Sequence, residues 1–283
     1  MGIVNATPDS FSDGGDRHGL DALVAKALAL AEEGADVIDV GGESGVTDRP
    51  AVSAREEIGR AAPLVARLAS EGLLVSVDTW KAEVARAALE AGAVMVNDPS
   101  GLRDAAMALV CAEANAGMVI THTRAAPKEK AFPAYDDVVA DVASFLAGAM
   151  ATAKEAGVAQ QRLVLDPGID LAKTPAQSVA VLRRLGPVRE LGRPILLAVS
   201  RKDFIGALLD RPPGGRGAGT LAALEAAVAG GAEYVRVHDV AAAADYLRVR
   251  AALRGELAVS PELRLAEELR REAVPLRALS EGP

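Results

Sequence analysis

Residues 73–97 read LLVSVDTWKAEVARAALEAGAVMVN and contain the unit from which the fold is predicted. Residues 73–77 are a short apolar run of strand length, and residues 94–97 are a second one. Between them, residues 81–91 place their apolar side chains at helical spacing. Two strands with a helix between them pair in parallel, because the helix returns the chain to the edge where the first strand began. The stretch predicts one β-α-β unit.

The same alternation continues in both directions along the chain. The candidate strands are residues 2–5, 37–40, 73–77, 94–97, 118–121, 163–165, 195–199 and 234–237. Segments rich in Ala, Leu, Glu and Arg lie between them with helical spacing, for example residues 20–33, 54–70, 81–91 and 136–156. Eight strands that alternate with helices fit either a closed barrel or an open doubly wound sheet.

The polar residues at the strand ends distinguish these two folds. They are Asn5, Asp39, Asp78, Asn97, His122, Asp166, Ser200 and the pair Arg236 and His238. A doubly wound sheet gathers its polar groups at one crevice, whereas a barrel brings the carboxyl ends of all its strands to one mouth. One such residue alone is usually a helix cap. The series favours an α/β fold, a single (β/α)8 TIM barrel over residues 1–256, and the charged pattern of residues 257–283 predicts a peripheral helical tail.

Composition excludes several classes of protein. The chain has 283 residues, of which 50% are hydrophobic and 25% charged, as in a folded domain. A net charge of −8 without a basic stripe argues against a nucleic-acid partner, and no apolar run has the length of a membrane helix. The single cysteine, Cys111, excludes an internal disulfide and is expected in the core. With no signal-peptide pattern after Met1, these features predict a cytoplasmic protein.

Basic side chains gather near the last two candidate strands. Arg201 and Lys202 follow the seventh strand, and Arg236 and His238 lie two residues apart on one face of the eighth. An Arg fork beside an imidazole suits an anion, and the late strands of barrels often form phosphate sites. A solvated charge cluster is the alternative, but charges on an inner strand are costly without a ligand. We expect an anion site.

Acidic and amide side chains end the earlier strands, namely Asp39, Asp78, Asn97 and Asp166. Carboxylates beside an amide match a heterocycle that carries hydrogen-bond donors and acceptors, such as an aminopyrimidinone. A cage for a divalent metal ion is the alternative. The two sets in one mouth predict a substrate with a polar ring at one end and a phosphate or diphosphate at the other.

Several short motifs follow one another along the chain. They are NATPDSFSDGG from Asn5, DVGGES from Asp39, SVDT from Ser76, VND from Val96, DPG from Asp166, SRK from Ser200 with FIG from Phe204, GTLAA from Gly219 and RVHD from Arg236. In this order they resemble the motifs of the dihydropteroate synthases, over about residues 1–250. Each tripeptide alone is common, but the ordered set is specific.

The resemblance implies a transferase of folate biosynthesis that forms a homodimer. It joins p-aminobenzoate to 6-hydroxymethyl-7,8-dihydropterin diphosphate and releases 7,8-dihydropteroate and pyrophosphate. The implied pterin residues are Asp39, Asp78, Asn97, Asp166 and Lys202. The diphosphate would lie against Asn5, Arg236 and His238, with Mg²⁺ held by phosphate oxygens and Asn5. Leu171, Ser200 and Arg201 would form the p-aminobenzoate side. Without a covalent nucleophile, Asp78, Lys202, Arg236 and His238 would be catalytic by electrostatic stabilisation of a pterin cation and its leaving group.

The p-aminobenzoate side departs from the family pattern. The usual Thr-Arg pair does not follow Glu43-Ser44 directly, although Thr47 lies three residues and Arg49 five residues after Ser44. After the fifth strand the usual Met-His-Met is THT, residues 121–123, and after the sixth the usual Gly-Phe-Gly-Lys is DLAK, residues 170–173. We therefore predict weaker binding of p-aminobenzoate and of sulfonamides than in a typical member. Residues 7–16 (loop one) and 45–53 (loop two) are expected to be mobile loops that substrates close.

Two other functions share this pocket. A pterin-binding paralogue without synthase activity would explain the altered p-aminobenzoate side. A methyltetrahydrofolate:corrinoid methyltransferase would share the barrel and the pterin pocket, but it has no need of the SRK and RVH motifs. The synthase is the leading hypothesis.

Overall fold

The structure is a computed structural model that describes residues 1–6, 16–45, 47 and 50–271. The chain divides into two compact units, Met1–Ala244 and Asp245–Pro283. The strands are β1 Gly2–Asn5, β2 Ile38–Gly41, β3 Val75–Asp78, β4 Met95–Asp98, β5 Gly117–Thr121, β6 Leu163–Asp166, β7 Leu196–Leu197 and β8 Tyr234–Val235. The helices are α1 Asp16–Glu32, α2 Ala54–Ser70, α3 Ala82–Glu90, α4 Ala105–Glu113, α5 Val138–Glu155, α6 Pro175–Arg183, α7 Gly186–Arg189, α8 Asp203–Leu209, α9 Gly217–Ala229 and α10 Val240–Leu253, with 3-10 turns η2 Gln160–Arg162, η3 Pro213–Gly215 and η4 Glu267–Leu269.

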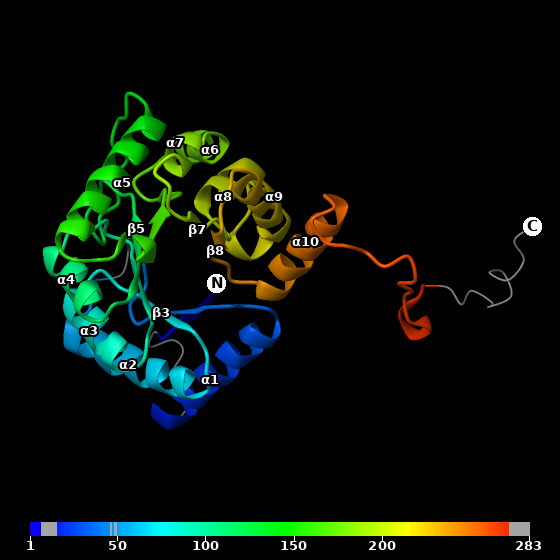
Figure 1. Ribbon diagram of the computed structural model, residues 1–283, viewed down its shortest axis with the longest axis horizontal. Coiled ribbons are helices and arrows are strands. Elements are labelled where there is room, and N and C mark those ends of the chain that lie inside the picture. Colours follow the sequence, from blue (N-terminus) through cyan, green and yellow to red (C-terminus); the bar gives the residue numbers. More distant parts are fainter. Residues whose placement is uncertain (7–15, 46, 48–49, 272–283) are drawn as a thin grey trace, which may run out of the picture. The chain divides into compact units, whose positions relative to one another are not determined.

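The strands of the first unit form two parallel ladders that meet in a ring. β1 to β6 pair in chain order, and β7 pairs with β8. A single bridge from Leu165 to Ile195 joins β6 to the β7 side, and one from Gly2 to Val237 joins β1 to the β8 side. We call these two joins the seams. The ring confirms the predicted (β/α)8 barrel, and Figure 1 shows its helices arranged around the strands.

The strand positions follow the predicted ones, with shifts at their ends. The helix predicted at residues 54–70 is α2 without change. The last two strands are shorter than expected, because the chain on either side of β7 and β8 takes part only in the seams. Asn5, Asp39, Asp78, Asn97 and Asp166 lie within strands, and His122 and Arg236 directly follow one. Ser200 and His238 lie three residues beyond the ends of β7 and β8.

Side-chain caps fix the helices that leave the barrel mouth. Ser53 accepts a hydrogen bond from Glu56 N and begins α2, and Asp137 caps α5 by accepting from its first backbone amides. Thr174 and Gln177 form a reciprocal capping box at the start of α6. Each cap places the end of a βα loop at a defined position, which anchors the loops that form the mouth.

Aliphatic side chains fill the barrel. Val119, Val164 and Leu196 form a buried cluster with Met95 and Tyr234 packed against it. Cys111 is fully buried on α4, as expected, and burial raises the pKa of its thiol to about 12. A thiol with that pKa is inert near neutral pH, so it is a packing residue.

The described part of the predicted tail is not an α-helix. Residues 257–269 are exposed, and residues 257–271 contain the single 3-10 turn η4. Pro261 interrupts the helical pattern there, and a short helix without a packing surface is marginal in water. The division of the chain at residue 256 stays a prediction. Among the described residues no helix has both the length and the apolar character needed to cross a membrane.

Candidate active site

The acidic and amide side chains meet at the barrel mouth. Asp39 of β2 is fully buried, and its Oδ2 accepts a hydrogen bond of 3.0 Å from Asn97 Nδ2 of β4. The other oxygen, Asp39 Oδ1, is buried with no hydrogen-bond partner in the described part of the chain. A buried acceptor of this kind is costly to leave unsatisfied and suits a ligand that brings an N–H group.

Arg236 bridges the two carboxylates of this set. Its Nε lies 2.6 Å from Asp39 Oδ2, and its Nη2 lies 2.7 Å from Asp78 Oδ2. Burial would lower the pKa of Arg236, but the two carboxylates outweigh it and raise that pKa. Burial raises the pKa of Asp78 to about 7 despite the opposing charge of Arg236. The predicted cationic and acidic sets therefore touch, rather than lying at separate ends of the mouth.

Asp166 and Lys202 form a second pair of opposite charges. Asp166 Oδ1 accepts a hydrogen bond of 2.8 Å from Gly168 N. Burial raises the pKa of the Asp166 carboxyl and lowers that of the Lys202 ammonium, and the charge of each partner opposes the other's shift. Ionisable groups with perturbed pKa values of this kind are typical of a functional site.

The β7 and β8 ends bring together the remaining predicted residues. His238 Nδ1 lies 3.0 Å from Ser200 Oγ, and burial and the nearby Arg236 lower the pKa of His238 to about 4. Arg201 is exposed and has a φ of 57°, and its backbone is held by Thr220 Oγ1. The imidazole of His238 is neutral at pH 7 and acts as a hydrogen-bonding group rather than as a cation.

Asn5 ends β1 next to Gly41 of β2. A Cβ atom on Gly41 would lie 3.3 Å from Asn5 Oδ1, so the glycine gives the amide its space. No group of three His, Cys, Asp or Glu side chains in the described ranges could hold a metal ion. The residues present fit a Mg²⁺ ion that takes one amide oxygen from the chain and its other ligands from phosphate and water.

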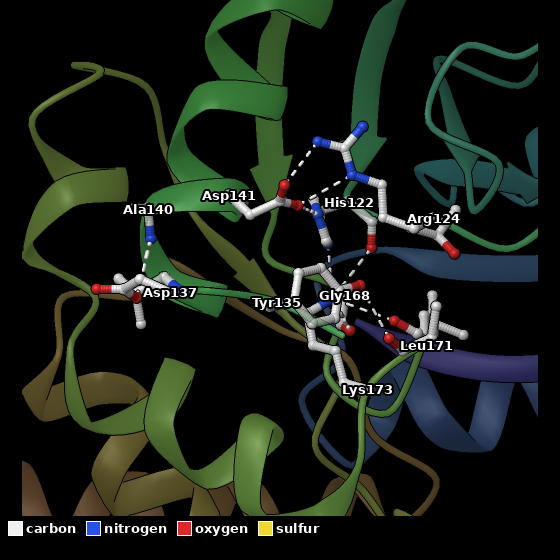
Figure 2. Close-up of polar contacts among 12 residues, drawn as sticks. His122, Arg124, Tyr135, Asp137, Ala140, Asp141, Gly168, Leu171 and Lys173 are labelled. Atoms are coloured by element: carbon white, nitrogen blue, oxygen red, sulfur yellow. Dashed lines mark hydrogen bonds and ion pairs between the residues drawn. The ribbon is translucent and has the colours of Figure 1, made fainter. Parts of the chain in front are cut away.

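A buried polar network beside the mouth was not predicted from the sequence, and Figure 2 shows its members. Lys173 Nζ lies 2.7 Å from His122 Nδ1, and His122 Nε2 lies 2.9 Å from Asp141 Oδ1. Arg124 Nη2 completes the chain 2.8 Å from Asp141 Oδ2. His122 and Lys173 are almost fully buried, at 0% and 1% exposure. His122 was predicted among the strand-end residues of the mouth, and both nitrogens of its ring are engaged by Asp141 and Lys173.

The network fixes residues 168–174, the loop after β6. Lys173 Nζ donates to the carbonyl oxygens of Gly168 and Leu171, at 2.9 and 3.1 Å. Burial lowers the pKa of His122 to about 4, so its neutral ring accepts from Lys173 and donates to Asp141. The sequence could not predict this role of Lys173, because its hydrogen-bond partners are backbone carbonyl groups, which leave no pattern in the sequence. Leu171, half-buried, is thereby held in place on the loop.

Loop two is anchored by a second buried cluster that the sequence did not indicate. Lys81 Nζ lies 2.5 Å from Glu43 Oε2 and 2.6 Å from Glu57 Oε2. Thr47 is exposed, and Arg49, its companion in the altered family motif, lies outside the described residues, as do residues 7–15 of loop one.

Known proteins match this chain over most of its length. The family model "Pterin binding enzyme" matches residues 1–238. A dihydropteroate synthase of Bacillus subtilis is 44% identical over 242 residues, which cover 85% of this chain and 83% of the relative. The solved Xanthomonas albilineans dihydropteroate synthase with 4-aminobenzoic acid has a TM-score of 0.84 and 45% identity, covering 90% of this chain and 92% of its own. The same enzyme with 7,8-dihydropteroate has a TM-score of 0.81 and 44% identity, with the same coverage.

Motif order, a closed barrel, the polar mouth and these matches lead to one assignment. The chain belongs to the pterin-binding enzyme family and, within it, to the dihydropteroate synthases, which are transferases of folate biosynthesis.

Proposed function

We propose that the polar groups of the mouth divide the dihydropteroate synthase reaction between them. Asp39, Asp78, Asn97, Asp166 and Lys202 bind the pterin, and Asn5, Arg236 and His238 bind the diphosphate. Leu171, Ser200 and Arg201 line the side where p-aminobenzoate enters. The observation that carries this assignment is the contact of Arg236 with Asp39 and Asp78, which places the anion-binding group directly beside the carboxylates.

The pterin side is supported by the hydrogen-bonding groups that it offers. Asp39 Oδ1 is a buried acceptor without a partner in the described chain, and the Asn97 amide lies next to it. An aminopyrimidinone ring carries adjacent N–H donors and a carbonyl acceptor, which match a carboxylate beside an amide. Lys202, with a pKa lowered by burial, supplies a donor to ring heteroatoms.

The diphosphate side is supported by a guanidinium group at the mouth. Arg236 pairs with Asp39 through Nε and with Asp78 through Nη2, and phosphate oxygens can accept hydrogen bonds from the same two N–H groups. Bound Mg²⁺ would neutralise phosphate charge and make the diphosphate a better leaving group. Asn5 is the residue that would ligate the ion, and His238 would donate a hydrogen bond to a phosphate oxygen.

The chemistry is a substitution at the pterin methylene carbon. The C–O bond breaks, and its electron pair leaves with the diphosphate. The guanidinium of Arg236 compensates the negative charge that develops on this leaving group. The pterin carries the positive charge that develops, and Asp78 stabilises it as a carboxylate. The amine of p-aminobenzoate then forms the C–N bond and gives up one proton.

Pyrophosphate release tests the proposal. With pterin diphosphate, p-aminobenzoate and Mg²⁺, the chain should release one pyrophosphate for each dihydropteroate formed. Tight binding of pterin diphosphate without turnover would instead identify a paralogue that has lost synthase activity, as the altered Leu171 side allows.

We further propose that the chain forms a homodimer and is located in the cytoplasm. The resemblance implies a homodimer, and the single buried cysteine, Cys111, is compatible with a reducing cytoplasm. Sedimentation of the full chain tests the dimer, because a monomer at micromolar concentration would contradict it.

A further inference from the structure

Asp170 occupies an unusual backbone position in the loop after β6. Its φ is 63°, in the left-handed region, and Ala172 in the same loop has a φ of 51°. A side chain with a Cβ atom is disfavoured there, although Asp is tolerated better than most residues. A strained position persists when the surrounding contacts determine it.

The Asp170 side chain makes contacts to two different helices. Its Oδ1 accepts a hydrogen bond of 2.9 Å from Ser178 Oγ of α6, and the backbone N of Asp170 donates a hydrogen bond of 3.1 Å to Ser178 Oγ. Its Oδ2 accepts a hydrogen bond of 3.1 Å from Phe204 N in the first turn of α8. Ser178 and Phe204 are buried, so both partners are fixed by packing.

These contacts join two parts of the mouth that the chain brings from separate strands. Leu171 directly follows Asp170, and Lys202 is the residue from which α8 begins. Asp170 is also the carboxylate that most strongly opposes the lowering of the Lys202 pKa by burial, ahead of Asp166. The Asp170 side chain thus fixes the backbone next to Leu171 and also favours the charged form of Lys202.

We propose that Asp170 is a positioning residue that couples the loop carrying Leu171 to the start of α8, and so sets where Lys202 stands relative to the p-aminobenzoate side. This role rests on the proposed function for its effect on turnover. Its effect on Lys202 can be measured without turnover.

Three variants separate the contact from the backbone strain. Asp170→Gly removes both side-chain bonds and relieves the left-handed strain. Asp170→Asn leaves one carbonyl oxygen and removes the charge. Ala172→Gly is the matched control, because it relieves the same kind of strain in the same loop and removes no polar group. Circular dichroism and thermal unfolding establish that each variant is folded.

The first measurement is the pH dependence of Lys202 acetylation by acetic anhydride, followed by mass spectrometry of the free protein. The apparent pKa of Lys202 should fall in both Asp170 variants, since a carboxylate that favours the ammonium is lost. It should stay unchanged in Ala172→Gly. An unchanged profile in Asp170→Gly, or an equal change in the control, overturns the proposal.

The second measurement is steady-state kinetics. Asp170→Gly should raise KM for p-aminobenzoate and lower kcat, together by about tenfold or more, and Asp170→Asn should do so to a smaller degree. Wild-type kinetics in Asp170→Gly would overturn the positioning role even if the Lys202 profile moved. If the wild type itself shows no turnover, the proposed function fails, and the acetylation profile alone still decides the role of Asp170.

Discussion

Arg236 and Asp39 are in direct contact across the barrel mouth, with Nε and Oδ2 2.6 Å apart although 197 positions separate them in the chain. The guanidinium proposed to hold the diphosphate is thus bound, in the structure, to a carboxylate proposed to hold the pterin. Substrate binding has to exchange these partners. The exchange keeps every buried charge compensated, since phosphate oxygens replace the carboxylates at Arg236 as pterin N–H groups reach Asp39.

The Arg236→Met variant should lose both stability and diphosphate affinity. Asp39 is fully buried and would lose its cationic partner, and breaking a buried pair by removing one partner typically costs about 3–5 kcal/mol of unfolding free energy. His238→Gln is the matched comparison. His238 is also on the proposed diphosphate side, and its side chain contacts Ser200 Oγ and no carboxylate of the described residues. It should weaken pterin diphosphate binding and change stability by less than about 1 kcal/mol. Urea unfolding and calorimetric titration give the two quantities, and equal stability of the two variants would contradict the resting contact.

Asp78 should make the wild type less stable as pH rises from about 4 to about 7. Its pKa is raised to about 7 in the folded protein, whereas an unfolded Asp titrates near about 3.9. Between these values the folded state binds more protons than the unfolded state, so the stabilisation present at low pH is lost as pH rises. Asp78→Asn should flatten this part of the stability profile, measured by urea unfolding at several pH values. An unchanged slope would show that Asp78 ionises normally.

Lys173→Met should destabilise the loop after β6. The carbonyl groups of Gly168 and Leu171 and the ring of His122 would lose their buried donor, at a cost of roughly 3 kcal/mol. The exposed Lys154→Met on α5 is the control and should change stability by less than about 0.5 kcal/mol.

The same lysine should also affect the pH profile. Burial lowers its pKa to about 7, so between about pH 7 and 10 the unfolded state binds more protons and stability rises with pH. Lys173→Met should lack this rise. A parallel profile in variant and wild type would mean that Lys173 titrates normally.

Leu171→Phe should improve p-aminobenzoate binding. An aromatic ring at this half-buried position would stack on the ring of the arylamine. Such a pair contributes about 1 kcal/mol, which corresponds to about a fivefold lower KM. Inhibition by a sulfonamide should tighten in parallel, because it uses the same ring. An unchanged KM would place the aromatic ring of the substrate away from Leu171.

The strand ends were predictable because their chemistry is local. Asp78 and Asn97 each close a short apolar run, and parallel strands bring such ends together. The contact between Arg236 and Asp39 was not predictable, since it depends on side-chain reach between distant strands. Nor was Lys173, whose burial depends on the path of a loop that places two carbonyl groups and an imidazole around one ammonium group. The prediction of a helical tail after residue 256 was wrong for its described part, because a helical pattern of charges does not form a stable helix without a surface to pack on.

The seams of the barrel coincide with a division of charge. The six-stranded ladder carries Asp39, Asp78, Asn97 and Asp166, whereas the β7–β8 pair carries Lys202, Arg236 and His238 at its ends. Each ladder is continuous, whereas within the described residues a single isolated β-bridge joins the two ladders at each side. Any opening of the barrel at the seams would change the distance between the acidic residues of one ladder and the basic residues of the other. Arg236, which follows β8, connects the two ladders through Asp39 and Asp78. A ligand that binds residues of both ladders would therefore resist their separation at the seams.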